Sequence, residues 1–345
     1  MKPLVTALID TFNHERYIEA ALVSVLEQGL SPSELEVVVV DDGSTDKTSE
    51  IIQKFLPRIK YVRKKNGGQA SAFNAAFPEV TGQIVAILDG DDWWAKGKLV
   101  TVLEELERHP EIPAVSHAYY RFYEETNEAK VVGPPETILV NMASPQAAHL
   151  AQQQWIYLIM GALTVRRKVL EQVIPIPEAL VFSADSMIAT ASMALGVRVL
   201  PQPLSYYRFH SANLYAINPD DRAKLRRRYE MDEIMCNQIS PMLLRLGVAP
   251  ECVSAFLDPV WIAIHRYKLR TFGGSRFETL QTEMLDFRAS YPNPSLGYRL
   301  FKYLVMGPAT LLLPPRRYYE LRDWYAGQNL GRFRDWLGRT GAAQG

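Results

Sequence analysis

Acidic residues follow an apolar run directly, in the pattern Asp89-Gly90-Asp91-Asp92. The run itself, Ile84 to Leu88, is entirely apolar, which is typical of a strand buried on both faces of a parallel sheet. The carboxyl ends of such strands line the crevice in which open α/β sheets bind ligands. Because carboxylates gathered there need a compensating positive charge, the pattern indicates a site for a divalent cation and a phosphorylated ligand.

A second run, Leu35 to Val40, is almost entirely apolar and ends in the acidic pair Asp41-Asp42. One such pair usually serves a turn or caps a helix, but two acidic strand ends in one parallel sheet lie on the same edge and favour a nucleotide or polyphosphate site. The sequence has no Gly-x-Gly-x-x-Gly after its first strand and no Gly-Lys-Ser/Thr loop. We therefore expect a metal ion and side chains to hold the phosphates.

Strand-like and helix-like segments alternate through the first half of the chain, which predicts a mostly parallel sheet covered by helices. After about residue 218 the pattern is helical, so we expect an α/β domain at 1–217 and a helical region at 218–345. The expected strands are 4–9, 35–40, 59–62, 84–88, 114–123, 160–165, 197–200 and 204–209. Two expected helices begin after Asn13 and after Ser44. The other expected helices cover 69–77, 98–108, 186–195, 220–246, 253–272, 276–291, 300–312 and 318 onward.

The bulk composition is that of an ordinary globular protein, with 48% hydrophobic and 22% charged residues in a chain of 345. Basic and acidic residues number 38 each, so the charge does not favour binding to nucleic acid. The two cysteines, Cys236 and Cys252, are too few for a disulfide framework and predict a reducing, cytoplasmic compartment. No apolar stretch is long enough to span a membrane.

Four motifs in sequence order resemble the nucleotide-sugar-binding half of the family 2 glycosyltransferases, which have the GT-A fold. They are Ala7-Leu8-Ile9-Asp10-Thr11-Phe12-Asn13, Val39-Val40-Asp41-Asp42-Gly43-Ser44-Thr45-Asp46, Asn66-Gly67-Gly68 through Asn74, and Leu88-Asp89-Gly90-Asp91-Asp92. The resemblance covers about residues 3 to 212 and implies an inverting, metal-assisted transfer of sugar. The donor would be a nucleoside diphosphate sugar, UDP-linked, and the acceptor a hydroxyl of a glycan or lipid-linked glycan.

The same resemblance implies roles for the motif residues. Thr11 would line the base pocket, Asp42 would accept the imide N–H of the base, and Asp89 would hold the ribose. Asp91 would coordinate Mg²⁺ or Mn²⁺, for which a hard oxygen ligand is suited. Asp92 is either an alternative ligand or a partner of the ligating residues.

A later segment, Val181-Phe182-Ser183-Ala184-Asp185-Ser186, matches the family pattern in which an acidic residue before a helix is the catalytic base. The resemblance therefore assigns to Asp185 the activation of the acceptor hydroxyl, although an Asp at such a position can also serve only as a helix cap. His210 corresponds to a metal or diphosphate contact, or it makes a local hydrogen bond.

The chain departs from the family pattern at Asp10, where Pro or Thr is common, at Phe73, where Arg is common, and at Ala184, where Glu is usual. Two other functions remain open on the residues alone. A nucleotidyltransferase also gathers acids and magnesium on such a sheet, and a catalytically silent module could keep the fold and bind a nucleotide sugar.

The C-terminal segment 294–345 interleaves basic residues with tyrosines, tryptophans and phenylalanines. Such a segment could lie on an anionic membrane surface, which would place the protein peripherally at the inner face of the membrane. The alternative is that its apolar faces pack on the rest of the chain or on a second copy in a homodimer.

Overall fold

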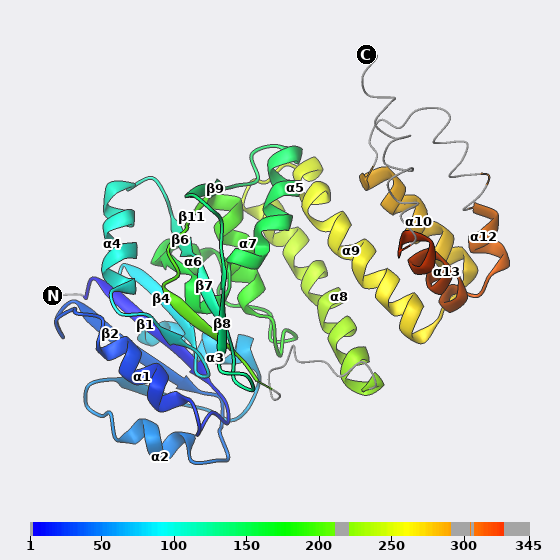
Figure 1. Cartoon of the computed structure of the whole chain (residues 1–345). Coiled ribbons are helices and arrows are strands. Elements are labelled where there is room, and N and C mark those ends of the chain that lie inside the picture. Colours follow the sequence, from blue (N-terminus) through cyan, green and yellow to red (C-terminus); the bar gives the residue numbers. More distant parts are fainter. Residues whose placement is uncertain (1–2, 211–220, 291–303, 305–306, 328–345) are drawn as a thin grey trace. The chain divides into compact units, whose positions relative to one another are not determined.

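The computed structural model describes residues 3–210, 221–290, 304 and 307–327 (Figure 1). Their contacts group them into two compact units. The first contains the described residues up to 210 and Asn237–Val253, and the second contains residues 221–236 and the described residues from Ser254 onward. Helix α8 (Arg222–Arg245) therefore supplies residues to both units. The predicted boundary itself lies outside the described residues.

The described residues of the first unit form a sheet of eight strands in the order β3-β2-β1-β4-β10-β6-β11-β9. Strand β1 pairs in parallel with both β2 and β4, and β10 is antiparallel between β4 and β6. The strands are β1 (Val5–Thr11), β2 (Leu35–Asp41), β3 (Lys60–Arg63), β4 (Ile84–Asp89), β6 (Ala114–His117), β9 (Ile138–Val140), β10 (Thr164–Arg166) and β11 (Val197–Leu200).

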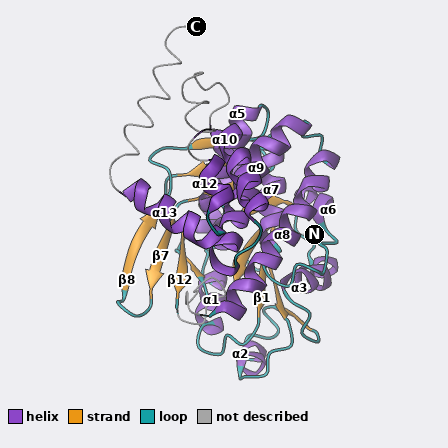
Figure 2. Cartoon of the chain, turned by 90° about the vertical axis from the view of Figure 1, so that its right-hand side faces the viewer, coloured by secondary structure: helices purple, strands orange, loops and turns teal. Residues whose placement is uncertain are grey.

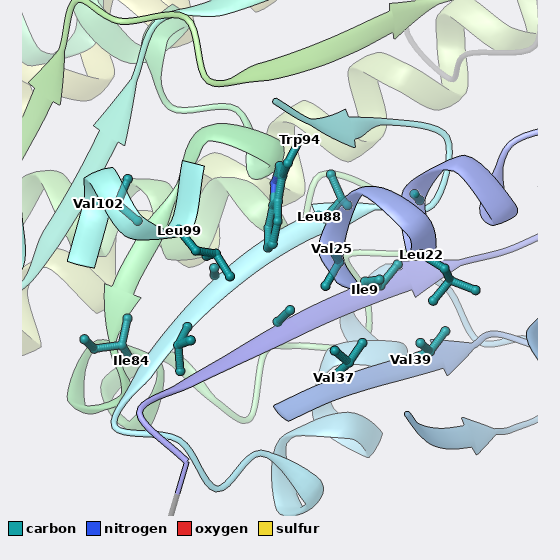
Figure 3. Packing of buried hydrophobic residues seen from close by; sticks show 14 of the residues in the cluster. Ile9, Leu22, Val25, Val37, Val39, Ile84, Leu88, Trp94, Leu99 and Val102 are labelled. Atoms are coloured by element: carbon teal, nitrogen blue, oxygen red, sulfur yellow. The ribbon is translucent and has the colours of Figure 1, made fainter. Parts of the chain in front are cut away.

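Helices cover both faces of this sheet, because its central strands bury alternate residues on either side. On one face, residues of β1, β2 and β4 form a core with α1 and α4, and Trp94 stands between these two helices (Figure 3). On the strands, Leu8, Val38 and Ile87 point away from this core and are also fully buried. The helices of this unit are α1 (Ile18–Leu26), α2 (Thr48–Gln53), α3 (Gln69–Ala76), α4 (Lys98–Arg108), α5 (Pro145–Gln154), α6 (Arg167–Val173) and α7 (Asp185–Leu195).

A second, smaller sheet has the order β5-β12-β7-β8, and Figure 2 shows β12, β7 and β8 side by side. Its strands are β5 (Trp93–Trp94), β7 (Tyr119–Tyr123), β8 (Glu128–Val132) and β12 (Ser205–Phe209). The ring of Tyr206 stacks between those of Trp93 and Tyr120, each at a centroid distance of 4.6 Å. This sheet joins the segment after Asp92 to the strand that ends just before His210.

The predicted bounds of α4 and β11 are confirmed, but several other expectations were wrong. The predicted strand 114–123 is two strands in different sheets, because the chain breaks at Ala118, which hydrogen bonds to Leu200 and Leu204. Asn13 does not cap the first helix, which begins at Ile18. The side chain of Asn13 instead accepts a hydrogen bond of 2.8 Å from the N–H of Thr45. Residues 160–162 form a 3-10 turn, and the strand begins at Thr164.

Helix α5 was not among the helices expected from the sequence. Its start signal is present in the sequence: Ser144 accepts a hydrogen bond from the N–H of Ala147 at 3.2 Å, and Pro145 occupies the first helical position. A serine cap followed by proline is a common way to begin a helix, since the missing N–H of proline would have no partner there.

The second unit is helical throughout its described residues and is held together by ion pairs as well as apolar contacts. Arg266 lies 2.5 Å from Asp286 and 3.3 Å from Glu283, and Tyr318 and Tyr319 are buried in a cluster with Leu269. No helix of the described residues is long and apolar enough to cross a membrane. Much of the predicted basic and aromatic segment 294–345 lies outside the described residues. Besides the first part of α8, the helices are most of α9 (Pro250–Phe272), α10 (Arg276–Ser290), α12 (Gly307–Leu312) and α13 (Pro315–Gly327).

Candidate active site

The candidate site begins where β1, β2 and β4 end side by side. In the register of the sheet, Thr11 lies opposite Asp41, and Asp10 lies opposite Asp89. The prediction that both acidic strand ends share one edge is therefore confirmed. Parallel pairing produces this result, because strands that run in one direction present their carboxyl ends together.

An acidic cluster, defined as Asp10, Asp89, Asp91, Asp92 and Asp185, gathers at the end of β4. Burial raises the pKa of Asp89 well above its usual range, and repulsion from the other four carboxylates raises it further. Burial also raises the pKa of Asp10 to about 7, opposed by a hydrogen bond with Asp89. Both pKa values are raised because two adjacent buried carboxylates resist carrying a full charge each.

Asp91 differs from its neighbours because it faces two histidines. Its Oδ2 lies 3.1 Å from Nε2 of His210 and 3.9 Å from Nε2 of His14. Burial alone would raise the pKa of Asp91, but the hydrogen bond with His210 and the charges of both histidines bring it below its usual value. Asp91 is thus ready to act as an ionised oxygen ligand.

Asp92 is buried, and its two oxygens have different surroundings. Oδ1 accepts a hydrogen bond of 2.7 Å from the N–H of Arg208, whereas Oδ2 has no hydrogen-bond partner among the described residues. The Arg208 guanidinium donates in turn to the carbonyl of Asp91 at 2.9 Å. Burial and the charge of Asp91 raise the pKa of Asp92 well above its usual range. Arg208 therefore links β12 to the acidic loop after β4.

Asp185 is the first residue of α7, and the N-cap position is taken by Ala184, which makes no side-chain cap hydrogen bond. Burial raises the pKa of Asp185 to about 6, although backbone hydrogen bonds from Ser186 and from Asp185 itself act to lower it. The carboxylate is close enough to repel Asp10 and Asp89. The helix start thus directs this residue toward the ends of β1 and β4.

The end of β2 is built differently. Asp42 accepts hydrogen bonds from the Lys64 ammonium at 2.7 Å and from the backbone N–H groups of Gly67 and Gly68 at 3.0 and 2.7 Å. Thr11, on the neighbouring strand, pairs its hydroxyl with Nδ1 of His14 at 3.1 Å. Both residues are buried beside the acidic cluster without belonging to it.

Glycine is required at position 90 for a steric reason. A Cβ at Gly90 would lie 2.6 Å from the Thr11 hydroxyl and 2.9 Å from Nδ1 of His14. The absence of a side chain lets the acidic loop pass directly over the end of β1.

Of the predicted site residues, Asp89, Asp91, His210 and Asp185 come together, and Thr11 and Asp42 lie at the adjoining strand ends. Four residues that contact them were not singled out from the sequence: His14, Lys64, Gln69 and Arg208. Two of these had a signal in the sequence, since His14 comes three residues after Thr11 and Gln69 comes directly after the glycine pair.

The donor set suits a hard or borderline divalent cation. Asp91 offers a carboxylate and His210 an imidazole nitrogen on the same side of the loop, and the surrounding carboxylates favour positive charge. No group of three or more histidine, cysteine or acidic side chains suited to a metal occurs within the described ranges. A cation held here would therefore take further ligands from phosphate oxygens and water, as Mg²⁺ commonly does.

The order of strands, the acidic loop after β4 and the helix-borne Asp185 together define a GT-A architecture. TarS of Staphylococcus aureus, solved with UDP-GlcNAc, aligns with a TM-score of 0.53 at 20% identity over 84% of this chain and 88% of that one. The mannosyltransferase PcManGT of Pyrobaculum calidifontis, solved with GDP-Man and Mn²⁺, aligns with a TM-score of 0.51 at 23% identity over 96% and 88%. These structures confirm the predicted fold.

Sequence comparison defines the family. The model of Glycosyl transferase family 2 matches residues 6–174. An uncharacterized glycosyltransferase of Nostoc sp. is 32% identical over 260 residues, which cover 70% of this chain and 76% of that protein. EpsJ of Bacillus subtilis, also an uncharacterized glycosyltransferase, is 26% identical over 73% of each chain. The chain belongs to glycosyltransferase family 2. A glycosyltransferase activity, and not the nucleotidyltransferase alternative, is therefore the supported one.

Proposed function

We propose that this glycosyltransferase moves a sugar, with inversion, from a UDP-linked donor to a hydroxyl of a glycan or lipid-linked glycan. The observation that carries the proposal is the approach of Asp185 to the acidic end of β4, where it contributes to the raised pKa of both Asp10 and Asp89. A base and a phosphate-binding edge are then within reach of one substrate. TarS, solved with UDP-GlcNAc, supports a nucleotide-sugar donor.

Donor binding is assigned to the ends of three adjoining strands. Thr11 and Asp42 would contact the base, and Asp89 the ribose. Asp42 accepts hydrogen bonds from three donors, and one of them, the N–H of Gly67, lies within reach of both carboxylate oxygens.

Asp91 and His210 would hold the divalent cation, Mg²⁺ or Mn²⁺, on the diphosphate. When bound, the cation supplies Lewis-acid neutralisation of the charge that grows on the departing nucleoside diphosphate. Arg208 would keep the loop in place, since it binds both Asp91 and Asp92 through the loop's carbonyl and carboxylate.

Asp185 would act as the general base. It would take the proton of the acceptor hydroxyl while that oxygen bonds to the anomeric carbon from the side opposite the diphosphate, so that the bond to the diphosphate breaks and the configuration inverts. A pKa raised to about 6 suits this task, because a base works best when its pKa is near the working pH.

The first experiment screens nucleotide sugars with Mn²⁺ for slow hydrolysis and then tests Asp185→Asn with the best donor. Removal of the base should lower turnover by about 10²–10⁴-fold and leave the donor Kd unchanged. Asp258→Asn, which alters an exposed aspartate of the second unit, is the matched control. Wild-type turnover in Asp185→Asn, or a product with retained anomeric configuration, would contradict the proposed mechanism.

The membrane contact expected of residues 294–345 is a separate proposal. Tyr318 and Tyr319 bear on it, because both are buried within the second unit and not available to a bilayer. That burial favours the packing alternative for this part of the segment. Sedimentation with anionic liposomes in low and high salt would test the hypothesis of membrane binding.

A further inference from the structure

Two segments far apart in the sequence are joined by hydrogen bonds beside the acidic cluster. One is residues 66–70, which we call the strap, and the other is the approach to α7. The N–H of Gln69 donates to the carbonyl of Val181 at 2.8 Å, and the N–H of Ala70 donates to that of Leu180 at 3.4 Å. The strap is therefore hydrogen bonded to the segment that leads into Asp185.

The Gln69 side chain makes a second link at the start of α7. Its Oε1 accepts a hydrogen bond of 2.9 Å from the N–H of Ala184 and a longer one of 3.4 Å from that of Asp185. Its amide also lies close enough to Asp10 to lower the pKa of that carboxyl, against the larger effect of burial. The first N–H groups of a helix have no partner within the helix, so an oxygen placed there orients the helix start. The Gln69 side chain thus orients the start of α7, at Ala184 and Asp185.

The strap has little freedom to move. Gly68 adopts φ +87°, and a Cβ there would lie 2.5 Å from the carbonyl oxygen of Val181. The N–H groups of Gly67 and Gly68 are both held by Asp42. On the other side of the contact, Ser183 has φ 62°, an uncommon conformation for a residue other than glycine. A backbone held in such a state needs surrounding contacts to persist, and the strap supplies them.

We infer that Gln69 is a positioning residue for Asp185, and that the strap connects the carboxylate that would bind the nucleotide base to the residue that would activate the acceptor. This inference rests on the proposed function. Asp42 holds the beginning of the strap, and Gln69 near its end holds the N–H groups of Ala184 and Asp185. Displacement of Gln69 would leave the acids in the chain but misdirect the carboxylate of Asp185.

Two variants test this role. Gln69→Met keeps the length of the side chain but removes its hydrogen bonds, and it should lower kcat by about 10²-fold, as small misplacements of catalytic groups do, with the donor Kd unchanged.

Gln69→Glu keeps the acceptor oxygen and adds a negative charge. Because Asp185 already faces Asp10 and Asp89, the added charge should move the acidic limb of the pH–rate profile to higher pH. Gln53→Met, at an exposed helical position, is the matched control.

The double variant Gln69→Met with Asp185→Asn separates positioning from general damage. If Gln69 acts through Asp185, the double variant should be no slower than Asp185→Asn alone. Wild-type kcat in Gln69→Met, an unshifted acidic limb in Gln69→Glu, or additive losses in the double variant would each overturn the inference. Wild-type turnover in Asp185→Asn would instead refute the proposed function, so the two failures are distinguishable.

Discussion

The ends of β2 and β4 look alike in the sequence but are built in opposite ways. Each strand is mostly apolar and is followed by neighbouring aspartates. At β2 each carboxylate oxygen of Asp41 and Asp42 has a hydrogen-bond donor, whereas at β4 Oδ2 of Asp92 has no partner among the described residues. The same residue type at the same edge of one sheet is thus satisfied by the protein in one place and only partly satisfied in the other.

The β2 end has a donor for each carboxylate oxygen. Asp41 is fully buried and accepts hydrogen bonds from the N–H of Ser44 at 2.7 Å, the Ser49 hydroxyl at 2.6 Å and the Tyr61 hydroxyl at 2.7 Å. Burial would raise the pKa of Asp41, but these hydrogen bonds lower it below the usual value. An ionised carboxylate is therefore stable there without any ligand.

The acidic cluster at the ends of β1 and β4 has fewer such donors. Oδ1 of Asp10 and Oδ2 of Asp92 have no hydrogen-bond partner within the part of the chain that the structure describes, and burial raises the pKa of both residues. Buried polar atoms without partners are costly in a folded protein. We infer that missing hydrogen-bond donors indicate an acidic site for a ligand better than the number of acids does.

The largest effect on turnover is expected for Asp91→Asn, which tests the difference between the two strand ends. Loss of the ionised ligand should lower kcat by about 10³-fold, since metal ions supply several kcal/mol of transition-state charge stabilisation. The variant should also bind Mn²⁺ more weakly, which calorimetry measures directly. Equal Mn²⁺ affinity in the variant and the wild type would remove Asp91 from the metal site.

Asp41→Asn tests the other strand end and should have the opposite profile. The amide would place an N–H₂ group against donors, which should reduce the free energy of unfolding by about 1–3 kcal/mol. Turnover by the folded variant should stay close to wild type. Urea unfolding and steady-state kinetics check the two halves of this prediction. A large loss of kcat without a loss of stability would make the two strand ends functionally equivalent.

The smallest effect concerns the pH dependence of stability without divalent cations. The pKa of Asp10 is about 7 in the folded protein, so its contribution to stability is present at acidic pH and is lost as the pH rises through about 7. Asp41 has a lowered pKa and acts with the opposite sign, since its contribution is lost only as the pH falls through that low value.

The melting temperature should therefore decline between about pH 4 and pH 7 by a few degrees, and Asp10→Asn should flatten that decline. Added Mn²⁺ should do the same in the wild type by compensating the charge. A decline that persists unchanged in Asp10→Asn would assign it to other groups.

Much of the fold and most of the acidic cluster could be predicted from local pattern. Apolar runs ending in acids predicted β2 and β4, and parallel pairing placed those ends together. The strands that were missed, β5, β8 and β9, have two to five residues each. The break at Ala118 depends on hydrogen bonds to Leu200 and Leu204, which are remote in the sequence. Periodicity cannot report such contacts.

The sequence by itself determined which residues could do chemistry: Asp89, Asp91, Asp185 and His210 occur in motifs whose spacing resembles family 2 glycosyltransferases. Only the tertiary structure decided how their charges are balanced. Whether an aspartate is ionised depends on the donors and charges around it. Residues such as Gln69, Arg208 and His14 supply them, and folding brings these residues next to the acidic cluster. A pKa is a property of surroundings, and the surroundings exist only once the chain has folded.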